Sequence, residues 1–408
     1  MECRICGSNE LEGVLDLGLS PVANHLLKSG AEKETRYRLS ASVCKSCGLM
    51  QIPPVLTPIE LFPGDYPYFS SYSSTWLEHS KKFAEQVCSF LTLDRSSHVV
   101  ELASNDGYLL QYFVSSGVKV TGVEPATGCA EVAMSKGVHT EQVFFGETTA
   151  GELLRKRGSA DLVVANNVLG HVPDIKDFMA GVEKILKPNG VASFEFPHSL
   201  NLILHNQFDT IYHEHYSYLS LRPVSVLLDM YGLKCFDVEK LPTHGGSLRV
   251  YVCRSDNTLY ETRQSVHALI EEEENNGMSD MSAYRAFAAR VKALRDDFLS
   301  FLIEQHREGK RVVAYGAPAK GNTFLNYCGV DTGYISFTVD KNVRKQGLLL
   351  PGSLIPIYSP EVLLEERPDY IVILPWNFKD EIIGQLKGKL DWDVKFVTAV
   401  PEFSINEI

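Results

Sequence analysis

Long apolar runs are missing from this sequence. No stretch approaches the roughly 18 consecutive apolar residues that a membrane-spanning helix needs. The first ten residues, MECRICGSNE, also lack the apolar core of a secretory signal peptide. The composition, with 44% hydrophobic and 22% charged residues, is that of a soluble globular protein. We therefore expect a cytoplasmic protein that makes no membrane contact.

Positive charge is scarce as well. The chain has 39 Lys and Arg against 51 Asp and Glu, which gives a net charge of -12. A long nucleic-acid groove needs an excess of basic residues, so we expect no nucleic-acid partner. A small anionic ligand is compatible with this charge, because backbone N–H groups can bind it. We expect a monomer or a small homo-oligomer.

The cysteines do not form an even set. There are nine, and an odd number in a cytoplasmic chain argues against a disulfide framework. Four of them form the pairs CRIC (Cys3, Cys6) and CKSC (Cys44, Cys47), each followed by glycine. Two such hooks predict a tetrahedral four-cysteine zinc site, which has no open position and is therefore structural. A redox pair would not explain why there are two hooks, and the acidic composition disfavours a nucleic-acid-binding zinc ribbon.

The length of 408 residues predicts two or three domains in an α/β protein. Residues 1–72 hold the cysteine pairs and end in a Pro-rich stretch. Residues 73–255 alternate short apolar runs with amphipathic ones, which predicts βαβ units and a mostly parallel sheet. Residues 256–408 start with a helical connector and continue as a second α/β segment. One face of the connector carries apolar residues at helical spacing: Phe287, Val291, Leu294, Phe298 and Phe301.

The run HVVELASNDGYLL predicts a strand, a loop over residues 103–107 and a helix that opens at Tyr108. The loop lacks G-x-G-x-x-G, which disfavours a nicotinamide or flavin cofactor. It is closer to the E-x-G-x-N-x-G loop of S-adenosylmethionine methyltransferases, with Ala103 where many of them have glycine. The next strand ends in Glu124, whose carboxylate suits two ribose hydroxyls. The alternative is an α/β domain without a cofactor.

A third predicted strand, in ADLVVANN, ends at the same edge of the sheet, and GHVPD follows it. In LKPNGVASFEFP we expect a helix exit, a turn at residues 188–190 and another strand, a pattern common in methyltransferases. The acidic run at 271–277 predicts a solvated helix end or turn. The predicted cofactor-binding residues are Glu101, Ala103, Ser104, Asn105, Asp106, Gly107, Glu124, Asn166, Asn167 and His171.

The stretch FDTIYHEHYSYLS (208–220) brackets a glutamate with two histidines. On a strand, His213 and His215 would share one face, whereas on a helix they would diverge. The stretch is not H-E-x-x-H, and four cysteines already account for a metal, so we do not expect a second metal here. Two interpretations stay open from these residues alone: a proton-transfer site and a buried polar cluster.

Four further segments carry candidate ligand contacts. DYPYFSSYSS (65–74) is rich in aromatic and hydroxyl groups, and LPTHGGSLRVY (241–251) contains a glycine turn; a linker and a hairpin are the alternatives. VVAYGAPAKGNTF predicts a strand, loop and helix that suit a phosphate, with Lys320 in reach, and PWN (375–377) follows another strand. The alternative is that this last domain only covers the site.

Taken together, the motifs resemble the sugar C-methyltransferases of deoxysugar biosynthesis, of the tetronitrose and mycarose type. The resemblance covers the whole chain in order: the cysteine hooks, YPYFSS, the N-D-G loop, HVP, IYHEH, HGGS and YGAPAKG…PWN. It implies an N-terminal zinc-binding module, a central Rossmann-like class I methyltransferase domain and a C-terminal Rossmann-like α/β domain without a redox cofactor. It also implies S-adenosylmethionine, structural Zn2+ and a nucleotide-linked 4-keto-6-deoxysugar, with dTDP or GDP as the nucleotide.

The resemblance also implies residue roles. His215 matches the general base, Glu214 the group that orients or charge-stabilises it, and Tyr212 or a nearby histidine the partner of an enolate oxygen formed during methylation at C3 or C5. A tyrosine of YPY, Tyr66 or Tyr68, is expected to reach the sugar. The expected substrate-binding residues are His213, His244, Gly245, Ser247, Lys320 and Asn377. The alternatives are an O- or N-methyltransferase acting on a sugar nucleotide and a catalytically inactive zinc-ribbon scaffold.

Overall fold

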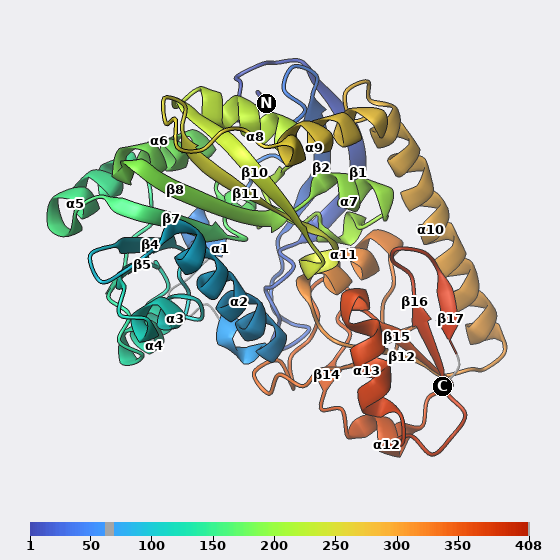
Figure 1. Ribbon diagram of the computed structural model, residues 1–408. Helices are drawn as coiled ribbons and strands as arrows, with labels where there is room; N and C mark the ends of the chain where they lie inside the picture. The colour runs from blue at the N-terminus through green and yellow to red at the C-terminus, as the bar shows by residue number, and fades with distance from the viewer. Residues whose placement is uncertain (62–68, 407–408) are drawn as a thin grey trace.

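The computed structural model describes residues 1–61 and 69–406, which form three β-sheets with helices packed around them (Figure 1). This confirms the predicted α/β class. Tyr66 and Tyr68 lie outside the described residues. Among the helices that are described, none is long and apolar enough to cross a membrane.

The N-terminal sheet is antiparallel, in the order β1-β2-β3-β9. Its strands are β1 (Leu11–Pro21), β2 (Arg36–Cys44), β3 (Met50–Gln51) and β9 (Ser217–Tyr218), and the short helix α1 (Pro58–Leu61) follows β3. Strand β9 comes from the central segment of the chain, directly after the YHEH motif. The motif is therefore tied to the N-terminal module through the pairing of Met50 with Tyr218.

The central sheet has the order β10-β11-β8-β7-β4-β5-β6, with β11 antiparallel to both of its neighbours. This is the arrangement expected of a class I methyltransferase. Its strands are β4 (His98–Leu102), β5 (Lys119–Val123), β6 (Thr140–Glu141), β7 (Ala160–Asn166), β8 (Leu186–Pro197), β10 (Leu233–Leu241) and β11 (Ser247–Arg254). All five residues of β4 are buried, as expected for a parallel strand covered on both faces.

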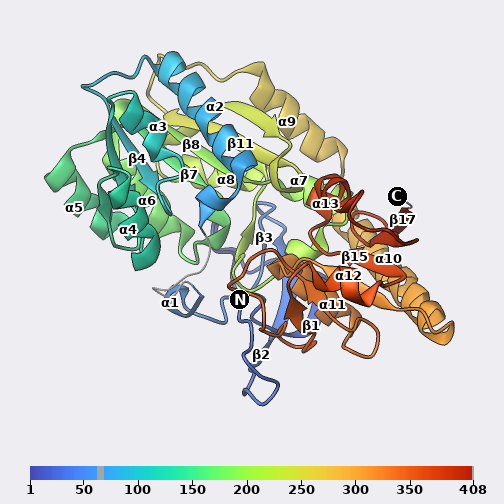
Figure 2. The same ribbon diagram turned by 90° about the horizontal axis from the view of Figure 1, so that it is seen from below.

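Helices cover both faces of this sheet (Figure 2). On one face, α2 and α3 bury Phe83 and Phe113 against the strands; on the other, α6 and α8 bury Phe178 and Leu227. Ser73 caps α2 by accepting a hydrogen bond from the Trp76 N–H. The helices are α2 (Ser74–Leu91), α3 (Leu110–Ser115), α4 (Thr127–Ser135), α5 (Glu147–Arg157), α6 (Ile175–Ile185), α7 (Ser199–Leu204) and α8 (Leu221–Asp229). Short 3-10 turns are η1 (Ser70–Tyr72), η2 (Leu169–His171), η3 (Phe208–Thr210) and η4 (Thr243–Gly245).

The C-terminal sheet has the order β14-β13-β12-β15-β16-β17 and is parallel except at β17. Two connector helices, α9 (Gln264–Asn275) and α10 (Ser282–Arg307), lead into it. The strands are β12 (Val312–Tyr315), β13 (Thr338–Val339), β14 (Ile357–Tyr358), β15 (Tyr370–Ile373), β16 (Lys395–Thr398) and β17 (Ser404–Asn406). Between them lie α11 (Ala319–Cys328), α12 (Val362–Glu366), η5 (Trp376–Phe378) and α13 (Lys379–Leu386).

One hydrophobic core joins the connector to its neighbours. The five apolar residues predicted to share a face of α10 are all buried, which confirms that prediction. They share this core with Met50 of β3, Phe208 of η3 and Phe324 of α11. The N-terminal module, the predicted catalytic segment and the C-terminal unit are thus packed together through α10.

Three local predictions need correction. Residues 188–190 are not a free turn but lie within β8. Residues 160 and 162 of β7 pair with residues 186 and 191 of β8, so β8 has three more residues than β7 in this interval and forms a bulge there. Helix α3 begins at Leu110 rather than at Tyr108. The acidic run at 271–277 is not fully solvated, because Glu273 is 3% exposed and bonds the His198 ring and the Leu221 N–H.

Candidate active site

The four paired cysteines meet at one point. Their sulfur atoms all lie within 4.8 Å of one another, and the Cys3–Cys47 and Cys6–Cys44 distances are both 3.5 Å. Zinc with four thiolates at about 2.3 Å would space the sulfurs about 3.8 Å apart. The glycine after each hook has a positive φ, +73° or +83°, which allows the tight turn. The residues therefore fit a structural zinc ion, and four protein ligands leave no open position.

The first cysteine hook also contacts the predicted catalytic segment. Arg4, between Cys3 and Cys6, donates to the Ser217 hydroxyl (3.1 Å), the Ile52 carbonyl (2.8 Å) and the Tyr216 carbonyl. The second hook contacts α8, because the Arg222 guanidinium donates to the Ser46 carbonyl at 3.2 Å. The zinc module is therefore attached directly to the chain that follows the YHEH motif.

The predicted cofactor loop, residues 103–107, lies at the C-terminal end of β4, beside the ends of β5 and β7. Ala103 adopts a left-handed backbone conformation with φ +54°, the conformation that glycine favours. An alanine there costs roughly 1 kcal/mol. The loop conformation is therefore formed although the first glycine is missing.

Buried polar atoms mark this edge of the sheet as a ligand site. Several oxygen atoms have no hydrogen-bond partner within the described chain: both of Glu101, Ser104 Oγ, Asp106 Oδ1, Asn166 Oδ1 and Asn167 Oδ1. Unpaired buried acceptors are costly unless a ligand supplies donors. Burial raises the pKa of Glu101 well above its usual range, with the Tyr108 hydroxyl acting in the opposite direction. The ammonium and ribose hydroxyl groups of S-adenosylmethionine are such donors, so the residues fit this cofactor.

Glu124 closes the loop from the next strand. Its carboxylate accepts the Asn105 N–H (2.9 Å) and the Ala126 N–H (2.8 Å). Burial raises its pKa, and these two backbone donors oppose the shift. Each carboxylate oxygen has a second lone pair, which leaves capacity for ribose hydroxyls.

The described part of the YPYFSSYSS motif covers the cofactor loop. The Ser70 N–H donates to Asn105 Oδ1 (2.9 Å), and the Ser71 hydroxyl donates to the Asp106 carboxylate. The described residues 70 and 71, which follow the YPY tyrosines in the sequence, are therefore in contact with the loop.

The YHEH motif is a turn between η3 and β9, and not a strand or a helix. Its four side chains divide into two pairs. His213 and Glu214 are 2% and 3% exposed, whereas Tyr212 and His215 are partly exposed. The two histidines, which a strand would place together, have different surroundings.

The buried pair faces the N-terminal module. The Glu214 carboxylate accepts hydrogen bonds from Asn24 Nδ2 at 2.8 and 3.0 Å, and its burial raises its pKa to about 7. The His213 ring lies edge-on to the Tyr37 ring of β2, 5.9 Å between centroids. His213, expected to bind substrate, is thus next to a strand of the zinc module.

His215 is held by the turn itself. Its Nδ1–H donates to the Thr210 carbonyl (2.7 Å), which selects the tautomer with the lone pair on Nε2. Its ring lies 3.9 Å from the Tyr212 ring and 4.6 Å from the His171 ring. Burial lowers its pKa well below the usual value, so the ring is neutral near pH 7. A backbone carbonyl and not Glu214 holds Nδ1 of His215, so the expected role of Glu214 in orienting or charge-stabilising the base stays a prediction.

His171, which was expected to bind the cofactor, contacts the turn of residues 211–216 that carries the YHEH motif and is called the catalytic turn. Its Nδ1 bonds the Glu214 carbonyl (2.9 Å), and burial lowers its pKa to about 4. A neutral ring that donates from Nδ1 has Nε2 as an acceptor only. His171 thereby supports the turn from the methyltransferase side.

The HGGS segment is the hairpin between β10 and β11. His244 Nε2 lies 3.3 Å from Asn167 Nδ2. The hairpin is therefore next to the cofactor edge, which is the edge of the central sheet formed by the C-terminal ends of β4, β5 and β7. Gly245 and Gly246 have φ of +85° and +112°, and a Cβ on Gly246 would lie 2.4 Å from Asn201 Nδ2. The Ser247 hydroxyl, expected at the substrate, donates to the Thr243 carbonyl and closes the turn.

Lys320 and Asn377 meet in the C-terminal unit. Lys320 Nζ contacts Asn377 Oδ1 and lies 4.3 Å above the Trp376 ring. The Trp376 indole N–H donates to Asp209 Oδ2 (2.7 Å) in η3, just before the catalytic turn. Burial lowers the pKa of Lys320 to about 8, and Asp209 opposes the shift. The predicted phosphate-binding pair therefore adjoins the catalytic turn.

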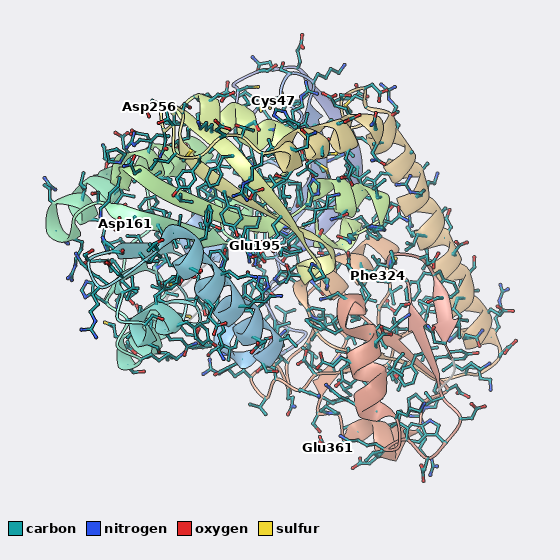
Figure 3. All side chains as sticks on the ribbon, viewed as in Figure 1. Cys47, Asp161, Glu195, Asp256, Phe324 and Glu361 are labelled. Carbon is teal, nitrogen blue, oxygen red and sulfur yellow. The ribbon has the colours of Figure 1, made fainter. Side chains whose placement is uncertain are left out.

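Sequence reasoning did not predict a row of alternating acidic and basic side chains on three neighbouring strands, which we call the charge ladder. Glu195 of β8 and Glu239 of β10 flank Arg249 of β11 at 2.6 and 2.9 Å, and His79 of α2 lies 2.9 Å from Glu195 (Figure 3 labels Glu195). His79 stacks on Trp76, whose ring also meets His244. A single acidic residue inside the apolar run ASFEFP was the available signal.

Family comparisons match all three parts of the chain. Residues 3–62 match a family described as "Putative zinc binding domain", residues 76–238 a "Methyltransferase domain" and residues 242–401 a "C-methyltransferase C-terminal domain". The chain is also 36% identical to the C-methyltransferase NovU of Streptomyces niveus, over 98% of this chain and 96% of that protein. The chain belongs to the C-methyltransferase family. This C-methyltransferase depends on S-adenosylmethionine and carries a structural zinc site, as expected.

Solved methyltransferase structures are similar to about half of this C-methyltransferase. An S-adenosylmethionine-dependent methyltransferase from Clostridium acetobutylicum is 15% identical with a TM-score of 0.36, covering 44% of this chain and 92% of that one. A 1,6-didemethyltoxoflavin-N1-methyltransferase from Burkholderia thailandensis is 18% identical with a TM-score of 0.38, covering 53% and 96%. TM-scores this low do not bear on function. The family membership itself favours carbon over oxygen or nitrogen as the methyl acceptor, and an active enzyme over a scaffold protein.

Proposed function

We propose that this C-methyltransferase adds a methyl group to C3 of a nucleotide-linked 4-keto-6-deoxyhexose through an enolate, in deoxysugar biosynthesis. The observation that carries the proposal is the state of His215. It is neutral, its Nδ1–H is fixed on the Thr210 carbonyl, and Nε2 is the basic atom. Its neighbour Glu214 is bonded to Asn24 of the zinc module, and Asp209, just before the turn, is bonded to Trp376 of the C-terminal unit.

His215 is suited to the proton step. A ketone at C4 acidifies the hydrogen on C3, and Nε2 takes this proton while the electron pair moves toward O4. Burial keeps the imidazole unprotonated at neutral pH, so the base is present in its active form. The hydrogen bond to Thr210 then stabilises the imidazolium that forms.

Tyr212 is the proposed donor to the enolate oxygen. Its ring lies 3.9 Å from that of His215, so a substrate at Nε2 is also near the phenol. The neutral His171 is less suitable, because its Nδ1–H is used on the Glu214 carbonyl. Tyr66 and Tyr68 are proposed to reach the same sugar from the N-terminal module.

The cofactor edge sets the direction of attack. When bound, S-adenosylmethionine supplies the electrophilic methyl group. Glu101, Asp106 and Asn167 present buried oxygens to its donor groups, and Glu124 is assigned to the ribose. Holding the two reacting carbons in line is worth several orders of magnitude in rate.

The sugar nucleotide is assigned to the hairpin and the C-terminal unit. His244 and Gly245 flank the sugar, and Lys320 with Asn377 binds the diphosphate of dTDP or GDP. A phosphate next to Lys320 would favour its charged form and compensate for its burial. We also propose units of 1–72, 73–255 and 256–408, which place these groups on three separate parts of the chain.

Substitution of Lys320 tests the diphosphate assignment. Lys320→Ala should weaken nucleotide-sugar binding by about tenfold and leave S-adenosylhomocysteine binding unchanged, as measured by calorimetry. The matched control is Lys341→Ala, since Lys341 is an exposed lysine of the same unit. Equal sugar-nucleotide affinity in both variants would contradict the assignment.

A substrate panel tests the proposed function. Purified protein is incubated with 4-keto-6-deoxyhexoses linked to dTDP or GDP and with a 13C-methyl donor, and the products are analysed by NMR. We expect a new methyl group on C3, bonded to carbon. Methylation at C5 would shift the proposal to that carbon, and no transfer to any 4-keto sugar would reject it.

A further inference from the structure

We propose that Trp376 and Asp209 are positioning residues for the catalytic turn, so that the C-terminal unit sets the orientation of His215. This inference rests on the base role proposed above. Trp376 belongs to η5 of the C-terminal unit, and Asp209 belongs to η3 of the methyltransferase unit. They are 167 positions apart in the sequence and in direct contact.

A short path leads from the indole to the base. Trp376 Nε1–H donates to Asp209 Oδ2 at 2.7 Å. Asp209 is 1% exposed, and its other oxygen has no hydrogen-bond partner in the part of the chain that is described. The following residue is Thr210, whose carbonyl accepts the Nδ1–H of His215. The hydrogen bond from the C-terminal unit thus holds the 3-10 turn that carries the acceptor of the base, together with the packing of Phe208 against Phe324 and Tyr327 of α11.

Trp376 also packs against the other side of the site. A Cβ on Gly245 would lie 2.7 Å from a ring atom of Trp376, so the indole is in close contact with the HGGS hairpin. The Gly245 carbonyl accepts Gln207 Nε2 (2.7 Å), and Gln207 directly precedes η3. The indole therefore contacts both the hairpin and the catalytic turn and holds them in position relative to each other.

The face of the indole meets the proposed diphosphate site. Lys320 Nζ lies 4.3 Å above the ring, within cation–π distance, and contacts Asn377 beside it. A diphosphate that draws Lys320 toward itself would alter the contact on the same ring that holds Asp209. Occupancy of the nucleotide site is thereby coupled to the geometry of His215.

The chain offers a matched pair of tryptophans for the test. Trp376→Phe removes the N–H donor together with the outer ring of the indole that contacts Gly245, so the Asp209 variants described below separate the hydrogen bond from the packing. Trp392 lies in the same unit and also donates its Nε1–H, to the Pro368 carbonyl at 2.8 Å, away from the site. Trp392→Phe therefore removes an equivalent hydrogen bond and controls for a general loss of stability.

Histidine NMR on the full-length zinc-loaded protein tests the inference and needs no sugar substrate. With 15N-labelled histidine, and His215 assigned by His215→Asn, the wild type should show a single neutral tautomer protonated at Nδ1. In Trp376→Phe this signature should be lost or averaged, and in Trp392→Phe it should persist. An unchanged His215 tautomer in Trp376→Phe would overturn the inference.

Kinetic measurements with a 4-keto sugar nucleotide are the second test of the inference. We expect kcat of Trp376→Phe to fall about tenfold to a hundredfold, with the affinity for S-adenosylhomocysteine unchanged. Asp209→Asn keeps an oxygen that can accept from the indole and should retain more activity than Asp209→Ala, which cannot. If the two Asp209 variants are equally impaired, the hydrogen bond is not the cause and the inference fails. If the wild type itself transfers no methyl to any 4-keto sugar, the proposed function fails, and the tautomer measurement still decides the positioning role.

Discussion

Glu214 and His215 are adjacent residues with opposite surroundings, and this difference separates their roles. Glu214 is buried against Asn24 of the N-terminal module, whereas His215 is turned toward Tyr212 and His171. The tautomer of His215, the proposed base, is set by a backbone carbonyl and not by the Glu214 carboxylate. We interpret Glu214 as the group that attaches the turn to the zinc module.

The raised pKa of Glu214 predicts a pH-dependent stability. Its pKa is about 7 in the folded protein against an ordinary value of 4.5, so the folded state keeps a proton that the unfolded chain has lost. Stability should therefore fall as the pH rises from about 4.5 to about 7. Glu214→Gln cannot lose this proton and retains an oxygen for Asn24. Its gain in unfolding free energy over wild type should be about 3 kcal/mol larger at pH 8 than at pH 4.5.

Denaturant unfolding at both pH values measures this difference. Glu152→Gln, at an exposed glutamate of α5, is the control and should show no such dependence. A pH-independent difference between Glu214→Gln and wild type would mean that Glu214 is ionised in the folded protein.

At the scale of single elements, three adjacent strands are joined by the Glu195–Arg249–Glu239 ladder. Arg249 is 2% exposed and Glu195 is fully buried, so neither charge can be hydrated if its partner is lost. Loss of one member of a buried ion pair typically costs 3–5 kcal/mol. The ladder holds β11, and with it the hairpin that carries His244, against β8.

Arg249→Met should accordingly lower the free energy of unfolding by about 3–5 kcal/mol. Arg263→Met, which removes an exposed partner of Asp237, should cost about 1 kcal/mol or less. Adding Glu195→Gln to Arg249→Met should restore part of the loss, because it removes the uncompensated charge. No recovery in the double variant would show that the cost comes from packing and not from charge.

The sequence predicted elements whose signals are local. The apolar run of β4 and the helical spacing of α10 depend on neighbouring residues only, and both predictions were confirmed. The environment of Glu273 was mispredicted because its partners, His198 and Leu221, are more than 50 positions away. The turn at residues 211–216 was equally hidden, since its pairing with the N-terminal sheet through β9 is a long-range contact.

The same limit applies to the site. Cysteine spacing was enough to predict the zinc ligands, whereas the assignment of the loop after β4 to the cofactor stays a prediction that its unpaired buried oxygens support. The acceptor for His215 and the partner of Asp209 were not predictable, because a backbone carbonyl carries no sequence signal and Trp376 lies in another sheet unit.

Viewed as a whole, the molecule assembles its site from three units. The hairpin and cofactor edge come from the central sheet, Lys320 and Trp376 come from the C-terminal sheet, and β3 with Arg4 holds the chain beyond the turn. In Figure 1 the N-terminal strands β1 and β2 lie between the central sheet and α10. Loss of one unit should therefore affect the turn more than the cofactor edge.

Removal of zinc tests whether loss of the N-terminal module affects the turn more than the cofactor edge. A chelator strong enough to strip the four cysteines should release Arg4 and loosen the turn that precedes its contacts at 216 and 217. We expect turnover to fall by about tenfold or more, while binding of S-adenosylhomocysteine at the central sheet changes little. Re-addition of zinc should restore activity. Equal loss of cofactor binding and turnover would indicate global unfolding instead.

Solvent exchange at the sugar tests the central claim most directly. A 4-keto-6-deoxyhexose nucleotide is incubated in D2O with the protein and S-adenosylhomocysteine, so that no methyl group can be transferred. The account predicts that the wild type incorporates one deuterium at C3, as followed by NMR, and that His215→Asn does not. Exchange at an equal rate in both proteins, or no exchange in the wild type, would contradict it.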